Sequence, residues 1–239
     1  MMNLKSTIKK VNSLLLKKYG IPHRNEKIPN SLDILIGTIL SQNTNDKNSY
    51  KAYTDLKKKY PQWDDVEKLT ASQIEKIINV AGLGKQKSNA IKKALTYLKN
   101  EKGELSLNYL KKLKDDEILT ELTQLEGVGL KTASCVLLFA LRRNSCPVDT
   151  HVNRTLNRIG IANSSNPEKT FKLVNSQMPE GIAHQFHTNL IRLGREICKP
   201  TNPNCTICPL KQICLFEDKK YDRLSDYKVN DFLLLDSIT

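Results

Sequence analysis

Four cysteines near the C-terminus are spaced so that their thiolates could bind one metal centre. Cys198, Cys205, Cys208 and Cys214 follow the pattern C-x6-C-x2-C-x5-C. Thiolates are soft ligands that favour zinc or iron–sulfur clusters. A zinc site usually contains two close cysteine pairs, whereas only Cys205 and Cys208 are close here. The uneven spacing therefore predicts that these four residues hold a 4Fe-4S cluster, with zinc as the alternative.

A Gly-x-Gly turn in the middle of the chain precedes a helical segment and could bind phosphate. The turn consists of Gly127, Val128 and Gly129. Glycine permits positive φ angles and a close approach of the backbone to a ligand, and the free N–H groups at the start of a helix bind anions. The pattern predicts an anion site of the helix-hairpin-helix type that does not recognise sequence. A simple helix–helix turn is the alternative.

Lys131 and Asp149 could together break an N-glycosidic bond. Lys131 falls in the first turn of the helix after the hairpin, where the helix dipole disfavours an ammonium group. Asp149 is expected at the N-cap of a further helix, where the helix amides stabilise a carboxylate. A lysine amine can add to C1′ of a sugar as the base departs, and the resulting Schiff base permits elimination of the 3′ phosphate. A carboxylate can stabilise positive charge on that sugar. The alternatives are a phosphate contact for Lys131 and a simple helix cap for Asp149.

The charge balance favours a polyanionic partner. The 239 residues include 38 Lys and Arg against 25 Asp and Glu, which gives a formal net charge of +13. Such a surface attracts nucleic acid, although a lysine-rich composition can also reflect the habits of the host. The apolar runs at the N-terminus are too short for a signal sequence or a membrane span, so we expect no membrane association. Four thiols reserved for a metal predict a reducing intracellular location, the cytoplasm or nucleoid if the source is prokaryotic.

Helical periodicity dominates the sequence and predicts an all-α fold. Apolar residues recur at i, i+3 and i+4, for example from Leu32 to Leu40, and no alternating strand pattern is convincing. Two pairs of residues have the spacing of capping boxes that begin helices, namely Thr70 with Gln73 and Ser165 with Glu168.

Three features in order along the chain resemble one known family. They are the segment from Leu125 to Ala133, the segment from Val148 to Val152, and the four-cysteine run. Together they resemble the endonuclease III family, which is the iron–sulfur branch of the helix-hairpin-helix DNA glycosylase superfamily. The resemblance extends from about Asn30 to Cys214. It implies that Lys131 is the nucleophile, that Asp149 is the catalytic acid, and that the four cysteines bind a 4Fe-4S cluster.

The resemblance also implies two helical lobes that flank a DNA-binding cleft. Residues 1–22 would form an N-terminal helix that joins the cluster lobe. Residues 23–139 would form a six-helix barrel, with the helix-hairpin-helix at about 119–139. Residues 140–214 would carry the catalytic aspartate and the cluster, and residues 215–239 would form a C-terminal extension.

Two loops of the barrel are expected to insert side chains into the DNA. A nucleotide that flips out of the duplex leaves a gap, and the family fills that gap from these loops. The DNA-contacting residues here would be Ser41, Gln42, Asn43 and Asp46 in the first loop and Leu83 in the second, together with the hairpin turn. Leu83 is the predicted wedge, and either Gln42 or Asn43 would fill the gap. The choice stays open because the first loop departs from the family pattern Ser-Ala-Gln-Ala-Thr-Asp.

The implied function is that of a bifunctional base excision repair enzyme. It would act as a monomer on double-stranded DNA with a damaged base or an abasic site, remove oxidised pyrimidines through a lysine Schiff base, and cleave 3′ of the abasic site by β-elimination. One alternative is a T/G or U/G mismatch glycosylase of the same superfamily, although such members mostly lack the hairpin lysine. The other alternative is a non-catalytic, DNA-binding iron–sulfur protein.

Overall fold

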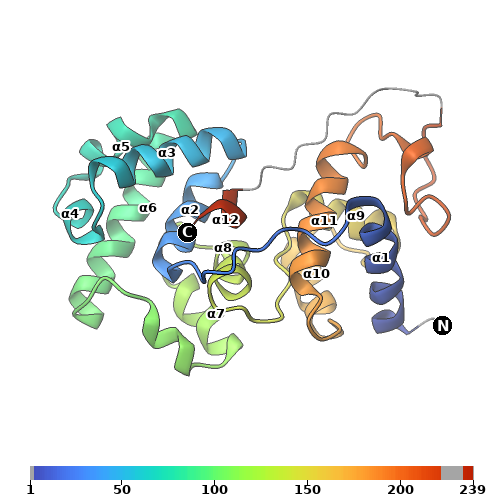
Figure 1. The fold of residues 1–239 in the computed structure, drawn as a ribbon, viewed down its shortest axis with the longest axis horizontal. Helices are drawn as coiled ribbons and strands as arrows, with labels where there is room; N and C mark the ends of the chain where they lie inside the picture. Colours follow the sequence, from blue (N-terminus) through green and yellow to red (C-terminus); the bar gives the residue numbers. More distant parts are fainter. Residues whose placement is uncertain (1–2, 222–233, 239) are drawn as a thin grey trace. The chain divides into compact units, whose positions relative to one another are not determined.

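The computed structural model describes residues 3–221 and 234–238, and in these residues the regular structure is entirely helical (Figure 1). The predicted all-α class is therefore confirmed for the described part of the chain. The chain divides into two compact units. One, here called the cysteine unit, takes its described residues from the ranges 1–23 and 144–231; the other, the hairpin unit, takes them from 24–143 and 232–239. The divisions follow residues 23 and 143, compared with 22 and 139 in the sequence prediction.

The hairpin unit is built around one buried, mostly apolar helix. Its α-helices are α2 (Ser31–Ser41), α3 (Asp46–Lys59), α4 (Trp63–Glu67), α5 (Ala71–Ile78), α6 (Gly84–Tyr97), α7 (Asp115–Thr123), α8 (Leu130–Cys135) and α12 (Leu234–Ser237). Short 3-10 segments, η1 (Asn79–Ala81) and η3 (Asn108–Lys112), and π-type segments, η2 (Leu98–Lys102) and η4 (Val136–Ala140), continue or join them. Every residue of α2 from Ser31 to Leu40 is buried. A helix that is buried on all sides must be covered on all sides, and α3, α6, α8 and α12 cover this one.

The cysteine unit is organised around a long helix near its centre. Its helices are α1 (Leu4–Tyr19), α9 (Thr150–Arg158), α10 (Pro167–Asn175), α11 (Ala183–Glu196) and the 3-10 turn η5 (Cys205–Ile207). Helix α11 packs against both α1 and α9. The crossing with α9 is close because Gly194 lacks a side chain: a Cβ there would lie 2.8 Å from the Cβ of His151. The glycine thus sets how near α9 can lie to the rest of the unit.

Helix starts follow the sequence prediction at one of the two capping boxes. The Thr70 box is present in full, since Thr70 Oγ1 accepts from the Gln73 backbone at 3.2 Å and Gln73 Oε1 accepts from the Thr70 backbone at 2.8 Å. The predicted box at Ser165 is wrong. Asn166 is the N-cap of α10 instead, and its side chain accepts from Glu168 N at 2.7 Å. Pro167 explains the shift, because proline is favoured at the first helical position and so makes the residue before it the cap.

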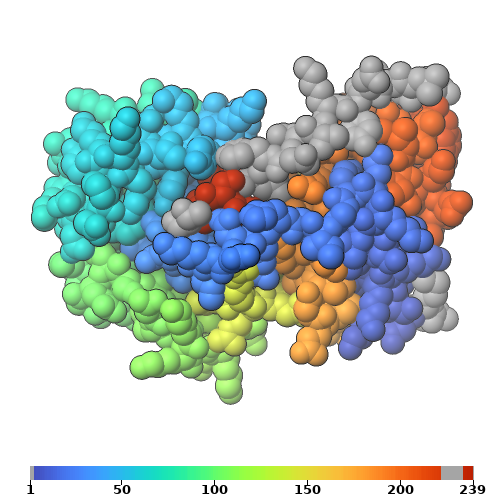
Figure 2. Space-filling model, in the orientation of Figure 1, coloured from blue at the N-terminus to red at the C-terminus, as the bar shows by residue number. Residues whose placement is uncertain are grey.

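The described residues of the predicted C-terminal extension, 215–239, are divided between the two units. Residues 215–221 belong to the cysteine unit, whereas 234–238 pack within the hairpin unit; residues 222–233 lie outside the described part. Ile238 is 1% exposed and fills the space beside Gly37 of α2 that a Cβ would need. Asn25 Nδ2 donates to the carbonyls of Asp236 at 2.9 Å and Ile238 at 3.3 Å. Figure 2 shows these last residues, in red, against the surface of residues coloured blue.

No helix in the described ranges has both the length and the apolar composition that crossing a bilayer requires.

We expect Ile238→Ala to lower the free energy of unfolding of the hairpin unit by about 2 kcal/mol, because it removes buried methyl groups from contact with α2. Urea unfolding followed by circular dichroism would measure this loss. Ile28→Ala is the control, since Ile28 is 57% exposed and its truncation should change stability by no more than about 0.5 kcal/mol. Equal stability of the two variants would contradict the proposed packing role of Ile238.

Candidate functional site

The predicted hairpin connects α7 to α8 and lies against α6. Gly127 has φ +78°, and a Cβ there would lie 2.8 Å from the Cβ of Ala90 in α6, so this position favours glycine for two reasons. Val128 is buried, and its N–H donates to the Leu125 carbonyl at 3.0 Å. Gly129 is the N-cap of α8 and supplies no capping side chain. A Cβ built at Gly129 would meet nothing within 4 Å, so the backbone is open on the side where that Cβ would lie.

Lys131 lies in the first turn of α8, directly after the hairpin turn. The following residues, Thr132 to Cys135, are all buried and fix this short helix against the hairpin unit. Lys131 itself is only partly buried. Lys131 therefore lies at the start of a helix, as the sequence predicted, and the buried residues that follow it anchor this helix in the core.

Two residues predicted to enter DNA have unusual backbone conformations. Asn43 has φ +49° and Leu83 has φ +51°, although neither is glycine. The left-handed region costs a residue such as leucine about 1 to 2 kcal/mol, so surrounding contacts must hold Leu83, whereas asparagine adopts this region more readily. Leu83 is 49% exposed and Asn43 is also exposed. An apolar side chain held outward by a strained backbone is typical of a binding surface.

Gln42 is engaged inside the unit, unlike its neighbour Asn43. Its Nε2 donates to the Gly127 carbonyl at 3.0 Å and lies 3.4 Å from the Thr132 hydroxyl. The first loop is therefore tied to the hairpin turn by this side chain. The two remaining residues predicted in the loop sit at helix ends. Ser41 closes α2 by donating to Thr38 O at 2.8 Å, and Asp46 begins α3.

Lys87 of α6 joins the two loops, and the sequence prediction missed it. The residue is 1% exposed, and its Nζ donates to the carbonyls of Leu40 and Ala81, both at 2.8 Å. Leu40 precedes the first loop and Ala81 precedes the second. Burial lowers the pKa of Lys87 to about 8. A sequence signal did exist, because Lys87 stands four residues before Ile91 on the apolar face of α6.

Asp149 lies in the cysteine unit, where it caps α9 as predicted. Its Oδ1 accepts from Val152 N at 2.8 Å. The segment before it is also fixed: Asn175 Oδ1 accepts from Cys146 N at 2.7 Å, and His187 Nδ1 lies 2.9 Å from the Pro147 carbonyl. These two contacts hold the backbone before Asp149 and do not involve its carboxylate. The position of Oδ1 is fixed by the hydrogen bond from Val152 N in the first turn of α9.

Helix α9 connects this carboxylate to the cysteine segment through two arginines that the sequence prediction did not single out. Arg154 Nε donates to the Cys198 carbonyl at 2.9 Å. Arg158 donates to the carbonyls of Lys199 at 2.7 Å and Pro200 at 2.9 Å, and its guanidinium lies 4.0 Å from the centre of the Phe216 ring. The i,i+4 spacing of the arginines places both on one face of α9.

The four cysteine side chains carry the donor chemistry of an iron–sulfur site. None forms a disulfide in the described residues. Burial, followed by the charges of the other thiols, raises the pKa of Cys208 to about 12, and burial also raises the pKa of Cys214. Two thiols with raised pKa values lose their protons readily only beside a compensating cation, which a metal centre supplies. Arg158 Nη1 lies 3.4 Å from Cys198 Sγ, as a hydrogen-bond donor to a cluster thiolate would.

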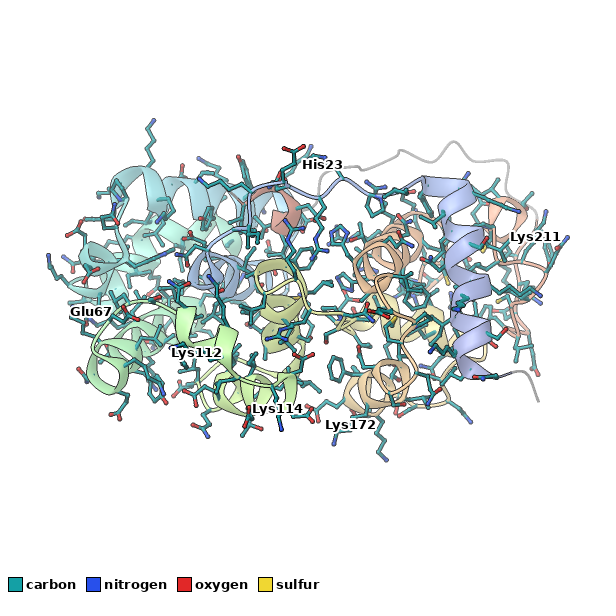
Figure 3. All side chains as sticks on the ribbon, turned by 60° about the horizontal axis from the view of Figure 1, so that its bottom comes forward. His23, Glu67, Lys112, Lys114, Lys172 and Lys211 are labelled. Carbon is teal, nitrogen blue, oxygen red and sulfur yellow. The ribbon has the colours of Figure 1, made fainter. Side chains whose placement is uncertain are left out.

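In the ranges 3–221 and 234–238, no three His, Cys, Asp or Glu side chains are grouped so as to hold a metal ion. Lys211, labelled in Figure 3, lies between the third and fourth cysteines and donates to the Thr206 carbonyl at 3.2 Å.

Comparison with known proteins points to one superfamily. The family model of the HhH-GPD superfamily of base excision DNA repair proteins matches residues 36–180. The chain is 33% identical over 193 residues to endonuclease III of Thermotoga maritima, covering 81% of this chain and 86% of that protein. It is 39% identical over 174 residues to a candidate DNA glycosylase of Arabidopsis thaliana. That match covers 72% of this chain but only 59% of the longer plant protein.

A solved structure of an endonuclease III–DNA complex shares the fold. It is a trapped covalent intermediate, with a TM-score of 0.75 and 28% sequence identity. The match covers 90% of this chain and 96% of the other.

The lowered pKa of Lys87 gives a pH dependence of stability with a definite sign. Between pH about 8 and 10.5 the unfolded chain binds this proton and the folded chain does not. The contribution of Lys87 is therefore complete above pH 10.5 and is lost as the pH falls through about 8, with a slope of at most about 1.4 kcal/mol per pH unit. Urea unfolding of the wild type and Lys87→Met across this range should give a stability difference that moves in favour of the wild type as pH rises. A constant difference would contradict the assignment.

Proposed function

Because the chain belongs to the HhH-GPD superfamily of base excision DNA repair proteins, we propose that it is a DNA glycosylase that also cleaves DNA at abasic sites. Lys131 at the start of α8 carries this proposal, since water-dependent glycosylases do not need an amine there. The related endonuclease III forms a covalent intermediate with DNA, and an amine is a nucleophile able to form one. The proposed substrate is double-stranded DNA that contains an oxidised pyrimidine or an abasic site, bound by one copy of the chain.

In the proposed reaction, the neutral amine of Lys131 attacks C1′ of the damaged nucleotide as the bond from C1′ to the base breaks. The base leaves with a proton from the amine. The bond from C1′ to O4′ then breaks, O4′ takes a proton from water, and a protonated Schiff base forms between C1′ and Nζ. Loss of a proton from C2′ then breaks the bond to the 3′ oxygen, so the 3′ phosphate leaves by β-elimination. Hydrolysis of the remaining imine frees the enzyme.

Asp149 has an electrostatic part in this proposal. One of its oxygens is held by Val152 N, which leaves the other to face developing positive charge on the sugar. This role requires an ionised carboxylate.

The DNA-binding part of the proposal divides the work among three segments of the hairpin unit. The amides at the start of α8, which no capping side chain occupies, bind a backbone phosphate. Leu83 enters the base stack as the wedge, and Asn43 fills the gap left by the flipped nucleotide. We favour Asn43 over Gln42 for the gap because Gln42 is already bonded to the Gly127 carbonyl, whereas Asn43 is exposed.

The four cysteines would hold a 4Fe-4S cluster in this proposal. Bound there, the cluster supplies a rigid cross-link among the four sulfurs and no step of the base-removal chemistry. Arg154 and Arg158 connect that cross-linked segment to α9 through backbone carbonyls. The cluster would therefore stabilise the helix whose first turn holds Asp149.

The lyase assignment predicts a covalent adduct that depends on Lys131. Incubation with an abasic duplex and borohydride should yield a protein–DNA adduct for the wild type and none for Lys131→Gln, while salt-dependent DNA binding by the variant stays within about threefold. Lys112→Gln is the matched control, because Lys112 is an exposed lysine of the same unit outside the hairpin (Figure 3). Wild-type protein that releases damaged bases without any adduct would contradict the lyase assignment and favour a water-dependent mismatch glycosylase.

The cluster assignment predicts the metal content of the purified protein. Chemical analysis should find about four iron atoms and four acid-labile sulfides per chain, since sulfide separates a 4Fe-4S cluster from zinc. Cys198→Ser should lose both and bind DNA weakly, whereas Cys135→Ala, which alters a buried cysteine of α8, should keep both. Stoichiometric zinc without sulfide would refute the cluster.

A further inference from the structure

We infer that Lys87 is a positioning residue that holds the two DNA-inserting loops in register with each other. The inference rests on the proposed function, because it concerns how that function separates the base pair. One buried ammonium group donates to Leu40 O, just before the loop of Asn43, and to Ala81 O, just before Leu83. No residue that touches the reacting sugar is involved.

Each of the two carbonyls lies shortly before a residue with positive φ. Leu40 stands three residues before Asn43, and Ala81 stands two residues before Leu83. Asn43 and Leu83 are two of the four non-glycine residues with positive φ in the described part of the chain. The last carbonyls of a helix have no partner within it, so without Lys87 these two buried ends would be free to relax. Fixing both with one group sets the separation of the two loops.

Burying the ammonium group of Lys87 costs free energy, and the fixed geometry of the two loops is what this burial provides. The ammonium group is buried, and desolvation lowers the pKa of Lys87. A methionine would fill nearly the same space without that cost. Two charge-assisted hydrogen bonds fix the direction of both backbone segments, which an apolar side chain cannot do.

A second lysine of the same helix provides a natural comparison. Lys92 Nζ donates to the Glu67 carbonyl and pairs with the Glu67 carboxylate at 2.9 Å, and Glu67 is labelled in Figure 3. The chain after Glu67 has no residue with positive φ before Gly82. Lys92 thus fixes α6 to the end of α4 without fixing a loop predicted to enter DNA.

Pre-organised loops should lower the barrier to separating the base pair and leave the chemical step unchanged. Loss of Lys87 should therefore slow reaction at a paired damaged base more than at the same base in an unpaired bulge, where no pairing has to be broken. Because Lys87 acts through Leu83, its loss should have little effect once the Leu83 side chain has been removed.

The test measures single-turnover base release from a duplex with the damaged base paired or bulged. Lys87→Met should be about tenfold slower than the wild type on the paired substrate and within about threefold on the bulged one. Lys92→Met should match the wild type on both. Lys87→Met combined with Leu83→Ala should be no slower than Leu83→Ala alone. Equal losses on the two substrates, or multiplied losses in the double variant, would overturn the inference and leave Lys87 a purely structural residue.

A measurement without chemistry separates this inference from the proposed function. In a Lys131→Gln background, fluorescence of 2-aminopurine placed beside the target reports unstacking, and Lys87→Met should reduce the signal while Lys92→Met should not. Absence of Schiff-base trapping with the wild type would refute the lyase and leave this result standing. If Lys87→Met fails to fold, Lys87→Arg keeps the charge and the donors and should retain the signal; a fall to the level of Leu83→Ala would contradict the inference.

Discussion

Backbone carbonyls at the ends of short helices are the constraint on which this structure depends. The described residues form no sheet, so a carbonyl that leaves a helix has no neighbouring strand to donate to it. Side chains donate to these carbonyls instead. Lys87 donates to the carbonyls before two loops, Gln42 donates to a carbonyl of the hairpin turn, and the arginines of α9 donate to carbonyls of the cysteine segment. Part of the excess of basic residues is therefore internal architecture, and only the remainder is available to an anionic partner.

The two units use this device for different purposes. In the hairpin unit, hydrogen bonds from side chains to carbonyls fix segments that contact DNA in the proposed function. Asn43 and Leu83, which have positive φ, follow three and two residues after the carbonyls that Lys87 binds. In the cysteine unit it makes α9 a rigid connection, with Asp149 bonded at its first turn and Arg158 bonded near its last. Gly194 permits that helix to lie close to α11. The cysteine segment and the carboxylate are therefore mechanically linked through nine residues of helix.

Local signals in the sequence were sufficient for most elements and insufficient for long-range side-chain partners. The all-α class, the box at Thr70 and the cap at Asp149 follow from spacing within one turn. The cap of α10 is Asn166 and not Ser165, because Pro167 takes the first helical position and so makes the residue before it the cap. The roles of Gln42 and Lys87 could not be derived in this way, because their acceptors lie 85, 47 and 6 residues away and become partners only after the chain has folded. Packing of Ile238 beside Gly37 is likewise invisible to any local pattern.

The contacts of α1 and α12 impose an order on the synthesis of the molecule. Helix α1 emerges first but packs on α11, and α2 receives its covering α12 from the far end of the chain. Neither unit is complete until the C-terminal part of the chain has been made. Until residue 238 has emerged, the space beside Gly37 lacks the side chain that fills it in the folded protein. Helices α3, α6 and α8 can cover α2 earlier in translation, so the side of α2 that α12 covers is the part that stays exposed longest.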